Sequence, residues 1–297
     1  MFPTAVNKGA LALFNAGLLI HPRASNQLAS PGDGWLQRQG YTLVWFGWQA
    51  DILPGGGRLT FEAPVVRNLD GSPITGLVRS EFEVRAPRPS LNLSSGWFTR
   101  NTHDSYPTVS PDSQTSFSDG FVPQLTVRPR EDAPRTPIAS SEWSFGSCPQ
   151  SGTAAPSEKQ ICYPAGFQPG RIYELIYRAK DPKVLGLGFA VARDLGSFLK
   201  YGPPEDAVRV ASDAPRMKSI IMGASQSGRM IRSFLSLGFN QDEAGRQVFD
   251  GAMPYIAAGR MPLNVRFGQP GRAWGQQIDH LYPGYDFPSA TGSNTIL

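Results

Sequence analysis

A short apolar strand that runs into a turn of small residues, and then into a helix, constrains this chain more than any other feature of its sequence. The apolar segment is Lys218–Met222, the turn is Gly223–Gly228 with the sequence GASQSG, and Ser227–Leu237 has the pattern of a helix. At such a strand-to-helix turn, the apical serine is held in a strained backbone conformation that exposes its hydroxyl group. The arrangement therefore predicts Ser225 as a nucleophile, and Gly223–Gly228 is called the elbow below.

The small residues around Ser225 support this prediction. Strand and helix backbones pack together at such a turn, so the residues two before and two after the nucleophile must be small, as Gly223 and Ser227 are. Ser227 fails the same test, because Arg229 would then stand in a crowded position. The pattern usually has glycine where Ser227 stands, and Gly228 is expected to relieve this departure. An ordinary turn with Ser225 as the helix N-cap is the alternative interpretation.

A serine that attacks an acyl group needs hydrogen-bond donors for the oxyanion that forms. The backbone N–H of Gln226 follows the nucleophile at the positive end of the predicted helix, which makes it the first candidate. The second donor usually comes from the loop after an earlier buried strand. Tyr41–Phe46 has the apolar pattern of that strand, so the N–H of Trp48 is the second candidate, with the N–H of Gln49 as the alternative. Alternatively, Trp48 is simply a core aromatic residue.

A serine nucleophile also needs a base, normally a histidine, and in this chain order the histidine follows the serine. The sequence has three histidines, of which only His280 comes after Ser225. We retain His280 as the candidate base, although the residues around it resemble a loop and no strand precedes it.

The acidic partner is less well defined by the sequence. Asp242 is expected on the surface near the end of a helix, and Asp250 is expected to be structural at the edge of a strand. The residues after Ala257 resemble a loop, so we expect the chain to end before the catalytic acid and histidine. The alternative function is therefore an inactive hydrolase-like remnant or a binding protein that lacks both groups.

Strand and helix patterns alternate in the second half of the chain. The segment Arg171–Tyr177 is a predicted strand, Val184–Leu199 a predicted helix, and Val248–Ile256 contains another strand. This order predicts an α/β fold with a mostly parallel sheet and helices on its faces. The apolar stretch Gly9–Ile20 resembles a signal peptide, but we expect Ala10–Phe14 to be a strand of the folded domain.

A region rich in Ser, Thr and Pro, residues 86–159, interrupts this order. It is predicted to be a β-rich, loop-rich insertion with weak strands at Gln124–Val127 and Trp143–Phe145. Leu77–Val84 alternates just before it, which predicts a half-exposed strand with Glu81 and its charged neighbours facing solvent. We expect residues 1–297 to form a single domain, incomplete at its C-terminus.

The two cysteines, Cys148 and Cys162, flank a polar segment rich in Ser, Gly and Pro. They are predicted to form a local disulfide, with two free thiols as the alternative. A disulfide favours export to the periplasm or the medium. Two cysteines without a nearby histidine do not make a zinc site, so no metal is expected.

The charge pattern limits the partners of the chain. The formal net charge is +4, but Lys and Arg are scattered rather than gathered in a dense run. This pattern does not favour a nucleic-acid partner. No apolar run reaches the length of a membrane-spanning helix. The oligomeric state is left open.

Several motifs spread along the chain together carry a resemblance to known proteins. These segments are Gly47–Gln49, Gly76–Arg79, Ile172–Tyr177, Gly186–Phe189, Gly223–Arg229, Leu237–Asn240 and Val248–Ala252. Their combination resembles the bacterial "alpha/beta hydrolase domain" proteins, which are regarded as serine esterases, from about residue 6 to about residue 288. The resemblance implies Ser225 as nucleophile, and it implies that family members extend beyond this chain at both ends.

Together these observations predict an α/β-hydrolase-like domain that cleaves a small-molecule carboxylic ester through an acyl-enzyme at Ser225. The N–H groups of Gln226 and Trp48 are expected to bind the oxyanion. This chemistry needs no organic cofactor.

Overall fold

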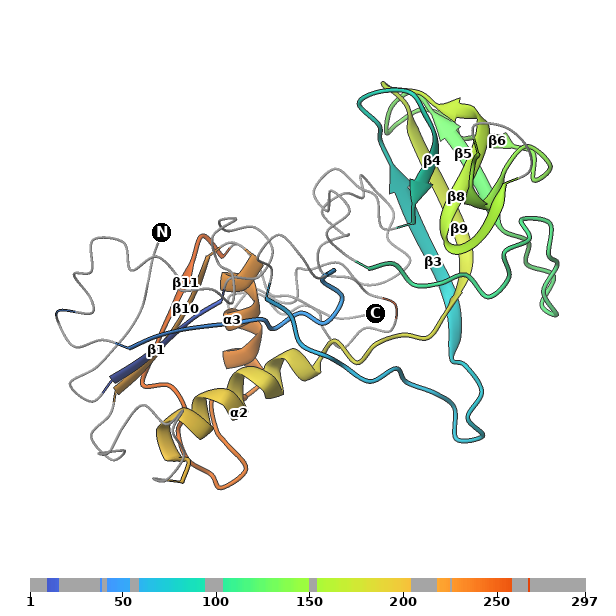
Figure 1. Ribbon diagram of the computed structural model, residues 1–297. Coiled ribbons are helices and arrows are strands. Elements are labelled where there is room, and N and C mark those ends of the chain that lie inside the picture. Colours follow the sequence, from blue (N-terminus) through green and yellow to red (C-terminus); the bar gives the residue numbers. More distant parts are fainter. Residues whose placement is uncertain are drawn as a thin grey trace. The chain divides into compact units, whose positions relative to one another are not determined.

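The computed structural model describes most of the chain, in segments. The described residues are 10–15, 38, 42–53, 59–93, 104–149, 154–203, 218–224, 226–257 and 267. The chain divides into two compact units (Figure 1). The parallel-sheet unit comprises Met1–Ala63, Leu185–Leu263 and Tyr285–Leu297, and the antiparallel unit comprises Pro64–Val184 and Asn264–Gly284.

The described residues of the parallel-sheet unit form a sheet of four strands in the order β11-β10-β1-β2, and every pair is parallel. Figure 1 shows β1, β10 and β11 side by side, with α3 next to them. The strand predicted at Ala10–Phe14 is confirmed, since β1 lies between β10 and β2 and pairs with both. The strands are β1 (Ala10–Asn15), β2 (Thr42–Phe46), β10 (Lys218–Ala224) and β11 (Gly251–Tyr255).

The helices α2 (Leu187–Tyr201) and α3 (Gln226–Ser236) belong to this unit, and they confirm both predicted helices with slightly shifted ends. Their apolar sides share one core with the strands and with the residues that lead into β11. Each large side chain buried there contributes roughly 1.5–3 kcal/mol. The fully buried aromatic residues of this core are Trp48, Phe189, Phe234 and Phe249.

The described residues of the antiparallel unit form two sheets. The direction of their strands differs from the direction expected from the sequence. The strand predicted at Arg171–Tyr177 is β9, and it pairs antiparallel with β3 on one side and β5 on the other. The expectation of a mostly parallel sheet is therefore not confirmed. One sheet is β3 (Thr75–Phe82), β9 (Ile172–Lys180), β5 (Gln124–Arg128) and β6 (Thr136–Ile138); the other is β4 (Arg88–Asn92), β8 (Ala155–Phe167) and β7 (Ser144–Ser147).

The weak strand signals within residues 86–159 correspond to β5 and β7. The unit that contains them is wider than the predicted insertion, because β3 precedes residue 86 and β9 follows residue 159.

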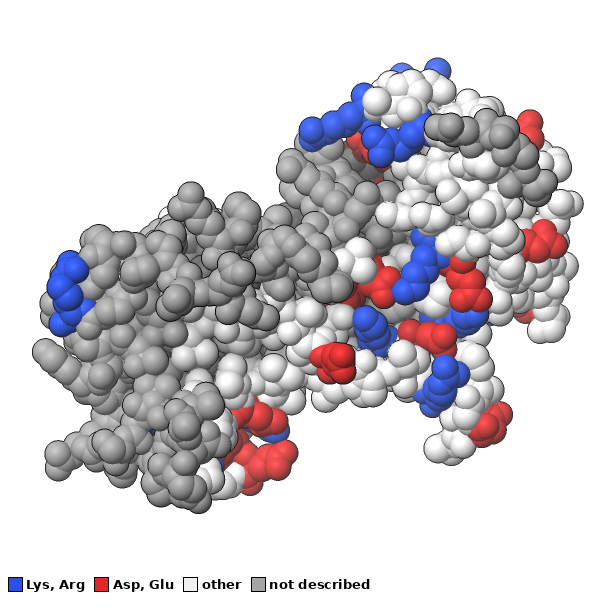
Figure 2. Space-filling view, in the orientation of Figure 1, with Lys and Arg blue, Asp and Glu red and all other residues white. Residues whose placement is uncertain are grey.

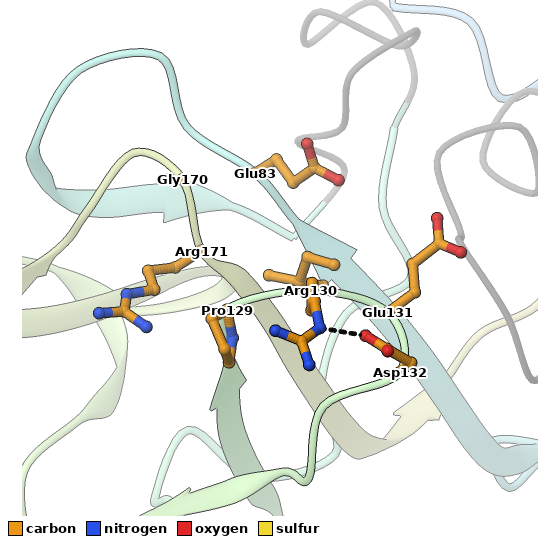
Figure 3. Close-up of a pocket in the computed structure, with 8 residues that line it drawn as sticks. Glu83, Pro129, Arg130, Glu131, Asp132, Gly170 and Arg171 are labelled. Atoms are coloured by element: carbon orange, nitrogen blue, oxygen red, sulfur yellow. Dashed lines mark hydrogen bonds and ion pairs between the residues drawn. The ribbon is translucent and has the colours of Figure 1, made fainter.

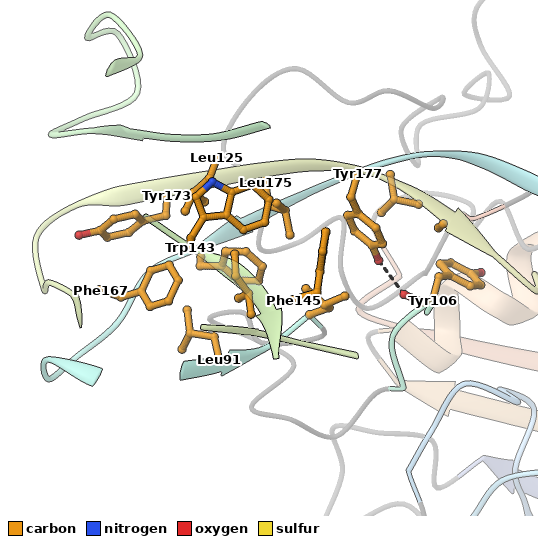
Figure 4. Packing of buried hydrophobic residues seen from close by; sticks show 14 of the residues in the cluster. Leu91, Tyr106, Leu125, Trp143, Phe145, Phe167, Tyr173, Leu175 and Tyr177 are labelled. Carbon is orange, nitrogen blue, oxygen red and sulfur yellow. Dashed lines mark hydrogen bonds between the residues drawn. The ribbon is translucent and has the colours of Figure 1, made fainter. Parts of the chain in front are cut away.

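Both antiparallel sheets contribute side chains to one aromatic core (Figure 4). The hydroxyl of Tyr177 donates a hydrogen bond of 2.8 Å to the carbonyl oxygen of Tyr106, so this buried polar group is satisfied. Edge-to-face contacts join Trp143 to Phe145 and Phe167 to Tyr173.

The charged side of the predicted strand is only partly exposed: Glu83 is exposed, as expected, but Glu81 on β3 is buried, which corrects the prediction that it faces solvent. Glu81 accepts a hydrogen bond of 2.7 Å from Arg128, and both side chains are only 1% exposed. Glu174 lies directly opposite Glu81 on β9 and accepts two hydrogen bonds from Arg135. Alternation of apolar and charged residues suits a half-exposed strand, but paired charges can also be buried on the second face.

The predicted disulfide between Cys148 and Cys162 is present, with a Cα–Cα distance of 4.9 Å that suits the bond. It joins the end of β7 to β8. The backbone N–H of Cys148 also donates a 2.6 Å hydrogen bond to the hydroxyl of Ser90 on β4. All three strands of this sheet, β4, β8 and β7, are therefore linked close to the disulfide.

The surface of the described residues mixes both signs of charge. On the face shown in Figure 2, Lys and Arg side chains are interspersed with Asp and Glu. Among the described residues, no helix combines the length and the apolar character needed to cross a membrane.

The buried ion pair predicts a specific stability effect. Replacing Arg128 by Met removes the Arg128 partner of the buried Glu81 carboxylate and should lower the free energy of unfolding by about 3–5 kcal/mol. The double variant Glu81→Leu/Arg128→Met should lose less, because both charges of the pair are removed together. Arg130→Met is the control, since the Arg130–Asp132 pair is 73% exposed on both sides and contributes little. Urea unfolding measures all three, and a loss below about 1 kcal/mol for Arg128→Met would contradict the prediction.

Candidate functional site

The predicted elbow lies between two well-ordered elements. Strand β10 ends at Ala224 and helix α3 begins at Gln226, so Ser225 is the link between them; Ser225 itself lies outside the described residues. Strand β10 is an inner strand of the parallel sheet, and Ile221, Met222 and Ala224 are buried. In open α/β sheets, ligands bind beside the carboxyl ends of the strands, which is where the elbow stands.

The small residues flanking Ser225 are in direct contact. A Cβ atom on Gly223 would lie 2.7 Å from the carbonyl carbon of Ser227 and 2.8 Å from its Cβ. Such distances are too short for any side chain at position 223. The strand and the first turn of the helix therefore pack backbone to backbone, which is the physical reason for the small-residue spacing seen in the sequence.

Gly228, in the first turn of α3, also lies close to neighbouring backbone. A Cβ atom there would lie 2.8 Å from the carbonyl oxygen of Tyr255 and 2.9 Å from that of Gly223. The helix therefore touches the end of β11 as well as the end of β10.

The loop after β2 reaches the same region of the unit. The Trp48 side chain is completely buried, and its Nε1–H donates a 3.2 Å hydrogen bond to the hydroxyl of Ser227. The indole is thus a core group, as one of the two interpretations of the sequence has it. This hydrogen bond involves the side chain of Trp48. The proposed binding of the oxyanion by its backbone N–H stays a prediction.

Gly47 is required by packing, because a Cβ atom there would lie 2.4 Å from the backbone nitrogen of Thr60. The hydroxyl of Thr60 donates a 2.8 Å hydrogen bond to the carbonyl oxygen of Gln49. The residues at 59–60 therefore hold the loop after β2 from the side, and both Gln49 and Asp51 are buried within it. This support could not be predicted from the sequence, because it comes from a segment that has neither strand nor helix periodicity.

Gln226 is the first residue of α3. The first N–H groups of a helix have no partner within the helix and carry partial positive charge. The position of Gln226 therefore suits the predicted oxyanion donor.

Asp250 is at the opposite end of the sheet from the elbow. Its backbone N–H donates to the carbonyl oxygen of Ser219, at the start of β10, with a distance of 2.7 Å. Lys200 and Lys218 each donate a 2.9 Å hydrogen bond to its carboxylate. Burial raises the pKa of Asp250, but the hydrogen bonds from Lys200, the Ser219 N–H and Lys218 outweigh it and lower the pKa to about 2. This arrangement is structural, as expected.

Asp242 is buried, which corrects the expectation of a surface residue. Its carboxylate accepts a 2.7 Å hydrogen bond from the Ser197 hydroxyl of α2 and hydrogen bonds from the backbone N–H groups of Ala244 and Arg246. Burial again raises the pKa of Asp242, but the hydrogen bonds from the Ser197 hydroxyl and from the N–H and guanidinium of Arg246 outweigh it and lower the pKa to about 2. Asp242 organises the turn after α3 and anchors it to α2.

His280, the candidate base, lies outside the described residues, so its role stays a prediction. In the part of the chain that the structure describes, no group of three or more His, Cys, Asp or Glu residues is arranged to hold a metal ion.

A pocket of about 510 Å³ lies in the antiparallel unit (Figure 3). Arg130 is turned towards Asp132 there, with 2.5 Å between Nε and Oδ1. Carboxylates and guanidinium groups are mixed along the wall, and it contains no residue of the predicted site. Its lining residues are Glu83, Pro129, Arg130, Glu131, Asp132, Gly170, Arg171 and Ile172.

Comparison with known proteins agrees with the geometry at the elbow. Residues 150–286 match the family described as "Alpha/beta hydrolase domain", which confirms the resemblance predicted from the sequence. The match covers less than half of the chain, and it contains β10, the elbow and α3. It indicates a hydrolase. No curated protein and no solved structure matches the chain.

The contacts of Gly228 predict that its replacement is costly. Gly228→Ala forces the first turn of α3 away from two backbone carbonyls, and it should lower the free energy of unfolding by about 1–3 kcal/mol. Gly251→Ala on β11 is the matched control, because its new Cβ would make only ordinary contacts of 3.5 and 4.0 Å with Ile220. Chemical denaturation of both variants tests this, and equal stabilities would contradict it.

The pKa of Asp250 predicts part of the acid sensitivity. The folded-state pKa of about 2 lies below the ordinary value of 3.8, so this stabilisation is present above about pH 4 and is lost as the pH falls towards 2. Asp250→Asn should therefore flatten the fall of the melting temperature between pH 4 and pH 2. Asp132→Asn, at an exposed carboxylate, should keep the wild-type slope. Identical slopes for all three proteins would show that Asp250 contributes nothing.

Proposed function

We propose that this protein is a serine hydrolase that cleaves small-molecule carboxylic esters through an acyl-enzyme at Ser225. The observation that carries the proposal is the backbone contact of Gly223 with Ser227, between an inner strand of a parallel sheet and the helix that follows it. An ordinary turn between a strand and a helix does not require this contact. The same segment lies within the match to the hydrolase family.

The reaction has two steps. The Ser225 oxygen attacks the ester carbonyl carbon while its proton passes to a base, and the C–O bond to the alcohol breaks as the alcohol oxygen takes up a proton. Water then attacks the acyl-serine in the same way, which releases the carboxylic acid and restores the serine hydroxyl. No oxidant, metal or organic cofactor takes part in this sequence.

The two oxyanion donors come from different parts of the parallel-sheet unit. In the proposal, the N–H of Gln226 at the start of α3 and the backbone N–H of Trp48 after β2 both point to the carbonyl oxygen of the substrate. The buried contact between Trp48 and Ser227 brings the two segments together, which supports this pairing. A donor of this kind contributes about 10²–10³-fold to kcat.

His280 is the candidate base, since it is the one histidine that follows Ser225 in the sequence. Its assignment is tested separately from that of the nucleophile, because a serine can be identified by covalent labelling whichever group removes its proton.

The test is labelling of the purified chain with a fluorophosphonate, located by mass spectrometry, together with hydrolysis of p-nitrophenyl acetate. We expect the label on Ser225, and Ser225→Ala should lower turnover by about 10³-fold or more. Ser236→Ala, at the exposed end of the same helix, is the control and should leave both readouts unchanged.

The variant His280→Ala tests whether His280 is the base or whether another group removes the proton of Ser225. Lost turnover in this variant identifies His280 as the base, whereas unchanged turnover removes it from the mechanism and leaves Ser225 in place. If the wild-type chain shows neither labelling nor turnover, the proposed function is wrong, and the chain is a non-catalytic relative of the hydrolases.

A further inference from the structure

The hydrogen bond from Trp48 to Ser227 joins two segments that are 179 residues apart in the sequence. Trp48 belongs to the loop after β2, and Ser227 belongs to the first turn of α3. Both side chains are completely buried. With the donor and acceptor excluded from solvent, water does not replace this bond when it is lost.

Ser227 is held from the other side as well. The backbone of Gly223 lies against its backbone and Cβ, closely enough to exclude any side chain at position 223. The Ser227 hydroxyl is therefore directed from a fixed backbone towards the indole. Since Ser225 stands between Gly223 and Ser227 in the sequence, the indole contacts one of the two residues that hold the elbow.

Burial of a tryptophan in this protein does not by itself require a partner for the indole N–H. Trp143, in the antiparallel unit, is 3% exposed, and its Nε1 has no hydrogen-bond partner in the described structure. Its ring packs edge-to-face on Phe145 instead. The directed bond of Trp48 is therefore a property of its site at the elbow.

We propose that the indole N–H of Trp48 is a positioning group, which sets the distance between the elbow and the loop after β2. This inference rests on the proposed function. In that function, the helix start carries the nucleophile and the Gln226 donor, and the loop carries the Trp48 backbone donor. One side-chain hydrogen bond thus holds the two halves of the oxyanion site in register. The indole acts through Ser227 and does not touch the substrate.

The experiment compares Trp48→Phe, Ser227→Ala and the double variant with the wild-type protein. Both single changes remove the hydrogen bond while the backbone N–H of residue 48 and the small residue at 227 are kept. We expect kcat and the rate of fluorophosphonate labelling at Ser225 to fall by about 10–100-fold, with KM within about twofold of wild type. Because both changes remove the same bond, the double variant should match the single variants rather than multiply their effects.

Trp143→Phe is the matched control, because it removes a buried indole N–H that has no partner in the described structure. It should leave kcat, KM and the labelling rate unchanged. Melting temperatures are measured for every variant, and if Trp48→Phe does not fold, Ser227→Ala decides the question.

The outcomes separate the two proposals. Labelled and active wild-type protein with unchanged rates in Trp48→Phe or Ser227→Ala would overturn the positioning role alone. Multiplicative losses in the double variant, or losses confined to KM, would also overturn it. Wild-type protein without labelling or turnover would overturn the proposed function and this inference with it.

Discussion

The contact between the Gly223 backbone and Ser227 is the constraint on which the parallel-sheet unit depends. It allows α3 to start directly at the end of an inner strand, with no room for a side chain between the two backbones. Gly228 extends the close approach to the end of β11. Trp48 then meets Ser227 from the loop after β2. Three strand ends and one helix start are thus brought to one place by short contacts, which is the environment that a serine nucleophile and its oxyanion donors require.

At the opposite end of the same sheet, charged side chains rather than glycine contacts join the elements. There Lys200 and Asp250 form a partly buried ion pair, and the Asp250 carboxylate also accepts a hydrogen bond from the Ser219 N–H at the start of β10. The antiparallel unit likewise buries the Glu81–Arg128 pair on the charged side of β3. Ion pairs of this kind contribute little net stability, but they strongly disfavour arrangements in which one charge is buried alone. Apolar burial supplies most of the stabilisation.

Patterns within single segments were sufficient for many of the predictions. β1, β2, β10, α2 and α3 follow from apolar periodicity, and the pairing of Cys148 with Cys162 follows from two cysteines that flank one short polar segment. The wrong predictions concern which distant segments a strand or a side chain contacts. The periodicity of β9 identifies a strand, but it does not say whether the neighbours run parallel or antiparallel. Asp242 follows a helix and looks exposed, yet Ser197 of α2 meets its carboxylate.

The sequence by itself determined the strand–turn–helix at the elbow and the small residues beside Ser225, because backbone conformation and local crowding depend on residues only a few positions apart. It also determined the family to which residues 150–286 are similar. The tertiary structure alone decided that the indole of Trp48 meets Ser227, that residues 59–60 hold the loop after β2, and that Glu81 is buried against Arg128. These contacts join segments that are distant in the chain. A directed hydrogen bond or ion pair between such segments forms only when folding has placed both groups in the same buried volume.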